Sequence, residues 1–410
     1  MNEFSVLVVI VSILAISFLV ERTLAWLNYR HWSEILPAEL NDVYDAEAYL
    51  KSQRYKKEND RLEMVTSSFS FLLTLAMFVF GGFAWLDEQV RQLTHHDLLV
   101  SLLFFGILYV AADLLSTPFA VYDTFVIEEK YGFNKTTPRL FVIDKLKGYM
   151  LTFLIGGGLL TLFILFYQYM GPYFWVYAWA GYTLFMILMQ LFYSDLIVPL
   201  FNKQTPLEDG ELKQAIEELC RTTAFPLKEV YVIDGSKRSS KANAYFTGLG
   251  VKKRIVLYDT LIQQLSVPEI VAVLGHEIGH YKRKHTLKHI IFSVVQNGIT
   301  LYLLSVFLNY PVFVRALGVN QPALHMGMVI FAVLYSPVSM AVGVCFNILS
   351  RRHEYEADAF VKQHGMARHL VSALKKLSRH NYSNLTPHPA YVFFYYSHPP
   401  LLQRIRALND

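Results

Sequence analysis

The chain has 410 residues, of which 54% are hydrophobic, 15% are aromatic and only 17% are charged. Its mean hydropathy of +0.31 excludes an ordinary water-soluble enzyme. The formal charge of +4 does not indicate nucleic-acid binding, because basic residues in a membrane chain mark the side of the membrane on which a loop lies. Two cysteines are too few for a disulfide framework. We therefore expect a monomeric membrane protein that contacts the lipid bilayer and no nucleic acid.

Seven apolar stretches are long enough to cross a bilayer, for which about 20 residues are needed. No basic segment precedes the first stretch, so we interpret it as a membrane helix rather than as a cleaved leader. The third stretch contains Asp113, and only Gly171 and Pro172 separate the fourth from the fifth, which indicates a tight helical hairpin. The predicted spans lie near residues 4–27, 64–86, 98–122, 149–170, 173–200, 286–310 and 327–350.

The basic residues of the connecting loops predict the orientation of these spans. The connections after spans one, three and five carry seven (counting Arg22 near the end of the first span), five and thirteen lysines and arginines, and the tail carries nine. The opposite connections carry Arg91, none, and Arg315. Since basic residues collect on the cytosolic side, we expect the N-terminus outside and the C-terminus in the cytosol. A bacterial inner membrane and an endoplasmic reticulum membrane both suit this topology.

The spans divide the chain into four parts. Residues 1–200 hold the first five membrane helices with their cytosolic loops, 201–285 form a cytosolic loop, 286–350 hold the last two helices, and 351–410 form a cytosolic tail. Within the long loop, residues 230–233, 242–247 and 254–258 have the pattern of short strands around a turn at 248–250. An exposed edge of such strands can hold an extended peptide by strand addition.

A metal-binding motif, HEIGH, occupies residues 276–280 in a segment that is predicted to be helical on other grounds. Ser266 and Glu269 have the spacing of a capping box, and Pro268 suits a first helical turn. On this helix His276 and His280 lie one turn apart on the same face and can bind one Zn²⁺ ion. Glu277 can then act as the general base toward the attacking water.

A catalytic zinc site needs a third protein ligand, and Glu354 is the candidate. Glu354 follows the seventh span and His280 precedes the sixth, so an antiparallel pair of spans brings both to the same depth. His353 is an alternative ligand. Asp358, one turn after Glu354, can accept the outer N–H of a ligand imidazole. The segment can also be a solvated acidic face that pairs with the arginines at 351 and 352.

The remaining candidates each have a structural alternative. His285 lies five residues after His280, away from the shared face, so we interpret it as a surface or chamber-lining residue. Polar residues within the predicted spans indicate either a wet intramembrane cavity or hydrogen bonds between helices; they are Asp113, Asp195, Gln296 and Asn297.

Several motifs together resemble the zinc-dependent CaaX prenyl endopeptidase family of the CaaX prenyl protease 1 type. The resemblance extends over nearly the whole chain. It is carried by HEIGH at 276–280, SRRHEYEADA at 350–359, YSHPP at 396–400, EKYGFN at 129–134, PLFNK at 199–203 and NAYF at 243–246.

This resemblance implies an all-α multi-pass membrane protein whose seven helices surround a water-filled chamber, with a gluzincin-like α+β peptidase portion in the cytosol. It implies one Zn²⁺ bound by His276, His280 and Glu354, with Glu277 as the base. By the same resemblance, His398 and Arg404 reach toward the substrate and its oxyanion, and a substrate-binding edge contains Asn243, Ala244 and Tyr245. From the residues alone, Asn243 can equally be a turn residue, His398 can cap a loop, and Arg404 can pair within the tail.

We therefore expect a membrane zinc endopeptidase that cleaves near the C-terminus of prenylated CaaX-type or other membrane-associated peptides. Two alternatives remain at this point. One is a membrane quality-control zinc protease of the heat-shock type. The other is a channel or transporter whose histidines bind a regulatory metal, although such proteins often have repeated, broken helices that this chain lacks.

Overall fold

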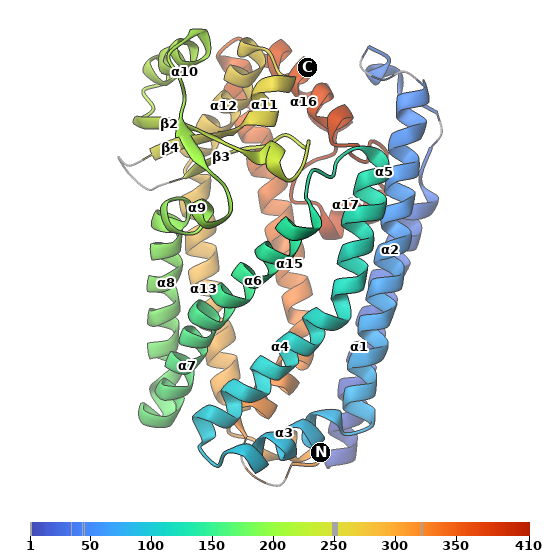
Figure 1. Ribbon diagram of the computed structural model, residues 1–410, viewed down its shortest axis with the longest axis vertical. Coiled ribbons are helices and arrows are strands. Elements are labelled where there is room, and N and C mark those ends of the chain that lie inside the picture. The colour runs from blue at the N-terminus through green and yellow to red at the C-terminus, as the bar shows by residue number, and fades with distance from the viewer. Residues whose placement is uncertain are drawn as a thin grey trace.

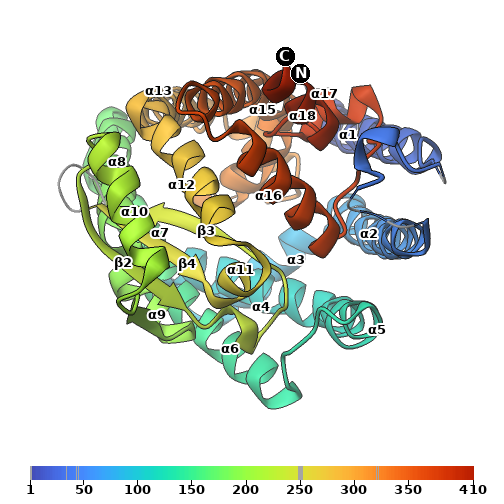
Figure 2. The same cartoon turned by 90° about the horizontal axis from the view of Figure 1, so that it is seen from above.

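The computed structural model describes residues 2–33, 35–42, 44, 46–247, 253–319, 321 and 323–410. Within these residues, seven helices are long and apolar enough to cross a membrane, which confirms the predicted number. They are Glu3–Arg30, Ala46–Val79, Asp97–Tyr131, Pro138–Tyr169, Gly171–Phe201, His285–Phe307 and Leu324–Gln363. Their most apolar windows bury only 6–17% of their residues, so each helix presents most of its length to lipid or to the interior of the ring that Figure 2 shows.

The spans include several shorter elements. The first two are α1 (Glu3–Arg30) and α2 (Ala46–Val79), joined by a loop with the short helix η1 (Ala38–Leu40). The third combines α4 (Asp97–Tyr122), the π-helical turn η2 (Asp123–Glu128) and α5 (Glu129–Tyr131). The fourth combines α6 (Pro138–Leu151), the π-helical η3 (Thr152–Gly156) and α7 (Gly157–Tyr169). The fifth runs through η4 (Gly171–Tyr173), α8 (Phe174–Leu196) and α9 (Val198–Phe201), and the last two are α13 (His285–Phe307) and α15 (Leu324–Gln363).

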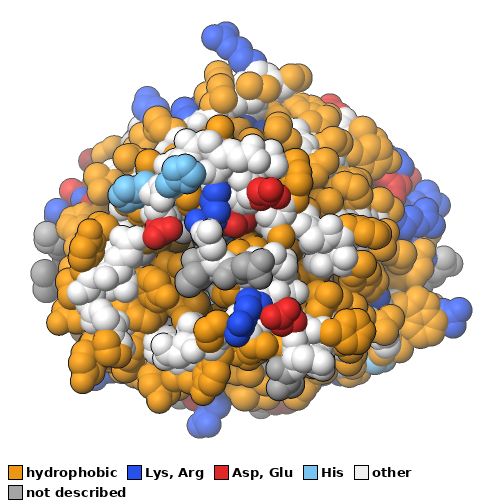
Figure 3. Space-filling model, turned by 90° about the horizontal axis from the view of Figure 1, so that it is seen from below, with side chains coloured by type: hydrophobic (Ala, Val, Ile, Leu, Met, Phe, Trp, Pro, Cys, Tyr) orange, Lys and Arg blue, Asp and Glu red, His pale blue; other side chains and the backbone are white. Residues whose placement is uncertain are grey.

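The second span ends earlier than the sequence predicts. We expected it to reach residue 86, but the helix stops at Val79 and Gly81 takes a left-handed conformation with φ of 70°. Glycine adopts this conformation without the steric cost that other residues incur. The chain then forms a separate amphipathic helix, α3 (Gly82–Leu93), at the end of the molecule where the N-terminus lies (Figure 1). Figure 3 shows that hydrophobic side chains cover most of this end.

A small mixed sheet and several helices cover the opposite end, where the C-terminus lies (Figure 1). The strands are β1 (Gln204–Pro206), β2 (Leu227–Ile233), β3 (Ala244–Thr247) and β4 (Lys253–Tyr258), in the order β1-β2-β4-β3. Only β2 and β4 run parallel. The sequence predicts three of these strands, although β2 begins before residue 230 and β3 begins after 242. The predicted turn at 248–250 lies outside the described residues.

The helices of this end are α10 (Glu211–Thr222), η5 (Gly235–Lys237), α11 (Asp259–Gln264), α12 (Val267–Lys282), α16 (Ala367–His380), α17 (Pro389–Tyr395) and α18 (Leu401–Asn409); α14 (Pro311–Arg315) lies near the other end. Their core is a buried apolar cluster in which Ile255 and Leu257 of the sheet meet Ile270, Leu274 and Ile278 of α12. Burial of this one face fixes α12 against the sheet and leaves its histidine face toward α15.

The packing of α12 on α15 depends on a glycine within the HEIGH motif. A Cβ atom at Gly279 would lie 3.1 Å from the backbone of Ala357 and 3.1 Å from the side chain of Phe360. Such contacts are tighter than ordinary van der Waals packing, so any larger residue would force the helices apart. The absence of a side chain at 279 therefore lets the motif helix approach the helix that carries Glu354.

Candidate metal centre

The start of α12 matches the sequence prediction. Ser266 and Glu269 form a reciprocal capping box, and Pro268 lies in the first turn. Glu269 also accepts hydrogen bonds from Ser372 Oγ at 2.6 Å and from Lys376 Nζ at 2.9 Å, both on α16. Burial alone would raise the pKa of Glu269, but these hydrogen bonds outweigh it and lower the pKa to about 2. These hydrogen bonds connect the N-terminal cap of the motif helix to α16 in the C-terminal part of the chain.

Three predicted ligands converge between α12 and α15. His276 Nε2 lies 3.1 Å from His280 Nε2, and both nitrogens lie near the Glu354 carboxylate, at 3.3 Å from Oε2 and 3.2 Å from Oε1 respectively. One ligand atom from each residue lies within 4.8 Å of the other two. The antiparallel arrangement of the last two spans therefore delivers the two parts of the predicted site to one place.

The chemistry of this cluster fits a metal ion. Glu354 is buried, and its Oε2 atom makes no hydrogen bond among the described residues, with His276 Nε2 at 3.3 Å and Arg404 Nη1 at 3.5 Å as its nearest ion-pair neighbours. A buried carboxylate oxygen without a partner is costly unless a cation satisfies it. Two imidazoles and one carboxylate are a donor set that zinc accepts in catalytic sites, where a fourth position stays open. The three residues therefore fit a zinc ion.

Asp358 and Arg404 form a buried layer behind His276. Asp358 Oδ1 lies 2.9 Å from His276 Nδ1, the position predicted for the partner of a ligand imidazole. Arg404, on α18, donates to both oxygens of Asp358 at 2.7 and 2.9 Å. Burial favours a lower pKa for His276, but its bonds to Asp358 and Glu354 outweigh this and raise the pKa to about 9. The layer therefore fixes the ring of His276.

Comparison with known proteins agrees with this geometry. Residues 25–203 match the family model described as the CAAX prenyl protease N-terminal region with five membrane helices, and residues 206–410 match peptidase family M48. The CAAX prenyl protease 1 homolog of Mus musculus is 34% identical, over 92% of this chain and 89% of its own length. The chain belongs to the CAAX prenyl protease 1 family. It is accordingly a multi-pass membrane metallopeptidase of the M48 type.

Other members of the family give the same result. CAAX prenyl protease 1 of Saccharomyces cerevisiae is 35% identical over 94% of this chain and 92% of its own length. The crystal structure of Ste24p from S. mikatae matches with a TM-score of 0.94 and 33% identity, over 99% of both chains. A match along the entire membrane part distinguishes the chain from the two alternatives, a heat-shock-type protease and a transporter.

His280 has a different outer partner, which the sequence analysis missed. His280 Nδ1 lies 2.9 Å from His285 Nδ1, and His285 Nε2 lies 3.0 Å from Glu356 Oε2. Our interpretation of His285 as a surface or chamber-lining residue is wrong, because it is only 1% exposed. The helix ends at Lys282, and Lys284 takes a left-handed conformation with φ of 57°. This break turns His285 back toward the site.

Glu277 and His398 occupy the more accessible side of the cluster. Glu277 is half-buried on α12, and its carboxylate makes no hydrogen bond or ion pair with another residue in the described part of the chain. His398 has a side-chain exposure of 63%, and its Nε2 lies 3.3 Å from Glu354 Oε1. Both side chains therefore lie on the side of the cluster that is open to solvent.

The predicted substrate edge lies on a separate element. Asn243 directly precedes β3, whose first residues are Ala244 and Tyr245, and β3 is an outer strand of the sheet. Backbone pairing places Asn243 opposite Tyr258, whose N–H donates to its carbonyl at 3.1 Å. The described contacts bring none of these three residues to the metal cluster. The sheet that contains these residues packs on the motif helix and so connects them indirectly to the cluster.

Proposed function

We propose that this chain is a zinc-dependent endopeptidase that cleaves peptide bonds near the C-terminus of prenylated CaaX-type proteins. The observation that carries the proposal is the convergence of His276, His280 and Glu354, whose ligand atoms lie within 4.8 Å of one another. The relatives' names, which specify a CAAX prenyl protease, support the substrate class. The distribution of basic residues supports a cytosolic site and C-terminus with the N-terminus on the other side.

In the proposed mechanism His276, His280 and Glu354 hold one zinc ion. When bound, zinc lowers the pKa of a coordinated water and polarises the scissile carbonyl. Glu277, adjacent to the first ligand on the same helix, takes the proton of the attacking water and passes it to the leaving amine. Its freedom from other partners suits this exchange of a proton.

His398 and Arg404 have complementary roles in this proposal. His398 is exposed beside Glu354 and can donate to the oxyanion that develops on the substrate. Arg404 holds Asp358 with Nε and Nη2, and its third nitrogen, Nη1, lies 3.5 Å from Glu354 Oε2. We assign Arg404 a fixed positive charge that stabilises the same developing negative charge. Asp358 orients the ring of His276.

The substrate binds in an extended conformation in this proposal. Asn243, Ala244 and Tyr245 lie at an outer strand, where unpaired backbone groups can pair with an added peptide. This pairing would present the scissile carbonyl in the extended form that hydrolysis requires.

One experiment tests the proposal directly. The purified protein is incubated with a farnesylated CaaX peptide and with its unprenylated counterpart, before and after chelation, and mass spectrometry locates the cleavage. We expect zinc at one ion per chain, cleavage of the farnesylated peptide close to its C-terminus, loss of activity on chelation and recovery on addition of zinc. Full activity in zinc-free protein would refute the metal assignment, and a zinc-loaded protein that leaves the farnesylated peptide intact would refute the substrate class.

A further inference from the structure

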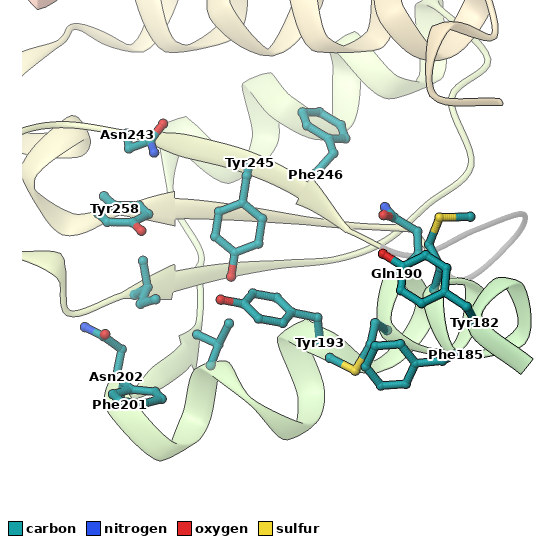
Figure 4. Close-up of a pocket in the computed structure, with 14 residues that line it drawn as sticks. Tyr182, Phe185, Gln190, Tyr193, Phe201, Asn202, Asn243, Tyr245, Phe246 and Tyr258 are labelled. Atoms are coloured by element: carbon teal, nitrogen blue, oxygen red, sulfur yellow. The ribbon is translucent and has the colours of Figure 1, made fainter. Parts of the chain in front are cut away.

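A cavity of about 650 Å³ lies between the sheet and the cytosolic half of α8. Figure 4 shows Phe185 and Tyr193 of α8 on one side and Tyr245 of β3 on the other, with Phe201 at the base. The cavity therefore joins a membrane-spanning helix to the outer strand of the peptidase portion. Its volume falls within the range of about 300–1,000 Å³ that is typical of small-molecule sites.

The lining of this cavity carries no formal charge. Most of it is aromatic or aliphatic, and α8 contributes two methionines, Met186 and Met189, one turn apart. Methionine adapts to irregular apolar shapes, and its sulfur makes favourable contacts with aromatic rings. An uncharged cavity of this kind excludes charged side chains by their desolvation cost and favours a long, flexible apolar group.

The cavity opens on one face of the outer strand. Successive residues of a strand point to opposite faces, so Asn243 and Tyr245 share one face, and Ala244 and Phe246 share the other. Ala244 and Phe246 pack against the apolar core of the peptidase portion, and Phe246 also contributes to the lining of the cavity. Tyr245 points toward α8, where its hydroxyl lies 3.3 Å from Ser194 Oγ. A peptide added to β3 would direct every second side chain toward this cavity.

We propose that this cavity binds the S-prenyl chain of the substrate cysteine, with Phe185, Met186 and Met189 as the residues that determine the preference for it. The inference rests on the proposed function. In a CaaX sequence the prenylated cysteine is three residues from the C-terminus, so the lipid lies within three residues of any bond that is cut near that end. The binding site of the lipid must therefore adjoin the binding site of the peptide.

A second apolar cleft is an alternative binding site for the prenyl chain. An apolar cleft of about 920 Å³ lies between α4 and α7 and is lined by residues such as Leu103 and Phe153. It is larger, but it shares no lining residue with the outer strand, and neither of the two cavities includes a metal ligand in its lining. The cavity beside α8 contains Asn243 and Tyr245 in its own lining. Continuity with the peptide-binding edge therefore favours the cavity beside α8.

The test compares two peptides of the same sequence, one with S-farnesyl cysteine and one with S-methyl cysteine. The readout is the ratio of their kcat/KM values in zinc-loaded wild-type protein and in Met186→Trp and Met189→Trp, which fill the cavity. We expect this ratio to fall roughly tenfold or more in each variant, the scale on which a pocket discriminates small apolar changes. Met340→Trp, on α15 beside a different cleft, is the matched control and leaves the ratio unchanged.

A second measurement uses the wild-type protein, so it does not require the variants to fold. A farnesyl analogue with a photoreactive group is bound to the wild-type protein, irradiated and located by mass spectrometry. We expect labels on α8 between Tyr182 and Tyr193. Labels on α4 and α7, or a selective loss of the farnesyl preference in Leu103→Trp, would overturn the proposal. An equal loss of kcat/KM for both peptides in the cavity variants would also overturn the assignment of the cavity, but it would leave the peptidase function intact. An inactive wild-type protein would instead refute the proposed function itself.

Discussion

Two histidine–carboxylate networks lie on α15, one near each end. Near its start, His325 Nδ1 lies 3.0 Å from Ser101 Oγ, and His325 Nε2 lies 2.7 Å from Asp87 Oδ1. Arg91 Nε donates to the other oxygen of Asp87 at 2.9 Å. Near its end, Glu354 meets the two motif histidines. The residue types of the two networks are similar, but their surroundings differ.

The difference shows what distinguishes a reactive site from a structural network. Ser101, His325 and Asp87 form a serine–histidine–aspartate arrangement, yet all three are buried and each has its partner. Ser101 is only 4% exposed and its hydroxyl bonds to His325, so the arrangement suits a structural role. At the candidate metal centre one oxygen of Glu354 makes no hydrogen bond among the described residues and His398 is exposed. An acceptor without a hydrogen bond and access for a ligand distinguish this end of α15 from the other.

The largest expected effect comes from the proposed base. In Glu277→Gln, kcat falls by roughly 10²–10⁴ because the amide cannot accept the proton of the attacking water. Zinc stays at one ion per chain, since Glu277 is not a proposed ligand. Peptide cleavage and elemental analysis on the same sample check both points. A fully active variant would remove the assignment of Glu277 as the base.

Removal of carboxylates from the end of α15 separates a ligand from an outer partner. Glu354→Ala should abolish stoichiometric zinc, because one of three protein ligands is lost. Glu356→Ala should weaken zinc binding roughly 10–100-fold, since Glu356 acts only through His285 on His280. Competition with a zinc chelator measures both affinities. Equal affinities in the two variants would contradict the choice of ligand.

At the other network the expected effect is on stability alone. Asp87→Ala leaves His325 and Arg91 without their buried partner and should lower the free energy of unfolding by roughly 3 kcal/mol. The zinc content of the folded protein should not change. Asp97→Ala is the control, because Asp97 is largely exposed and lies 3.9 Å from the same arginine. Denaturant titration in detergent measures both, and loss of cleavage by folded Asp87→Ala would contradict a purely structural role.

The cap of the motif helix predicts an effect of similar size that depends on pH. The pKa of Glu269 is about 2 in the folded protein against a usual value of 4.5, so the folded state releases this proton more readily than the unfolded chain. The carboxylate therefore stabilises the fold fully above about pH 4.5, by about 3 kcal/mol, and this contribution is lost as the pH falls toward about 2.

Glu269→Gln removes this contribution. The difference in unfolding free energy between wild type and Glu269→Gln should therefore be largest near neutral pH and shrink below about pH 4.5. Glu211→Gln provides a matched control, because Glu211 is also an acidic residue in a first helical turn but is exposed. A difference that stays constant between pH 7 and pH 3 would show that the charge of Glu269 is not the cause.

Much of the fold follows from local sequence. Apolar runs of sufficient length predict all seven spans, because backbone groups in lipid must be satisfied within each helix. The break at Gly81 was missed, since its neighbours are as apolar as the span itself. β1 was missed because it has only three residues and includes Pro206, which an outer strand tolerates. Short elements of this kind form only where a neighbouring strand is already present.

The site residues also divide into those that local sequence predicts and those that only the fold reveals. Spacing on one helix predicts His276, Glu277 and His280, and the order of the spans brings Glu354 to them. The pair of His285 and Glu356 was missed because the turn at Lys284 cannot be read from a helical repeat. The network of Ser101, His325 and Asp87 was missed because His325 lies more than 200 positions from the other two in sequence, and only the tertiary fold joins them.

The long helix α15 connects the third predicted ligand, Glu354, directly to the membrane-spanning part of the chain. Glu354 lies seventeen residues after Pro337 within one uninterrupted helix. At a rise of about 1.5 Å per residue this arm is about 25 Å long, so a pivot of one degree at the proline moves the carboxylate by about 0.4 Å. Spanning helices change tilt when the bilayer becomes thinner or thicker. A change in the thickness of the surrounding lipid would therefore act on the Glu354 carboxylate through a lever of this length.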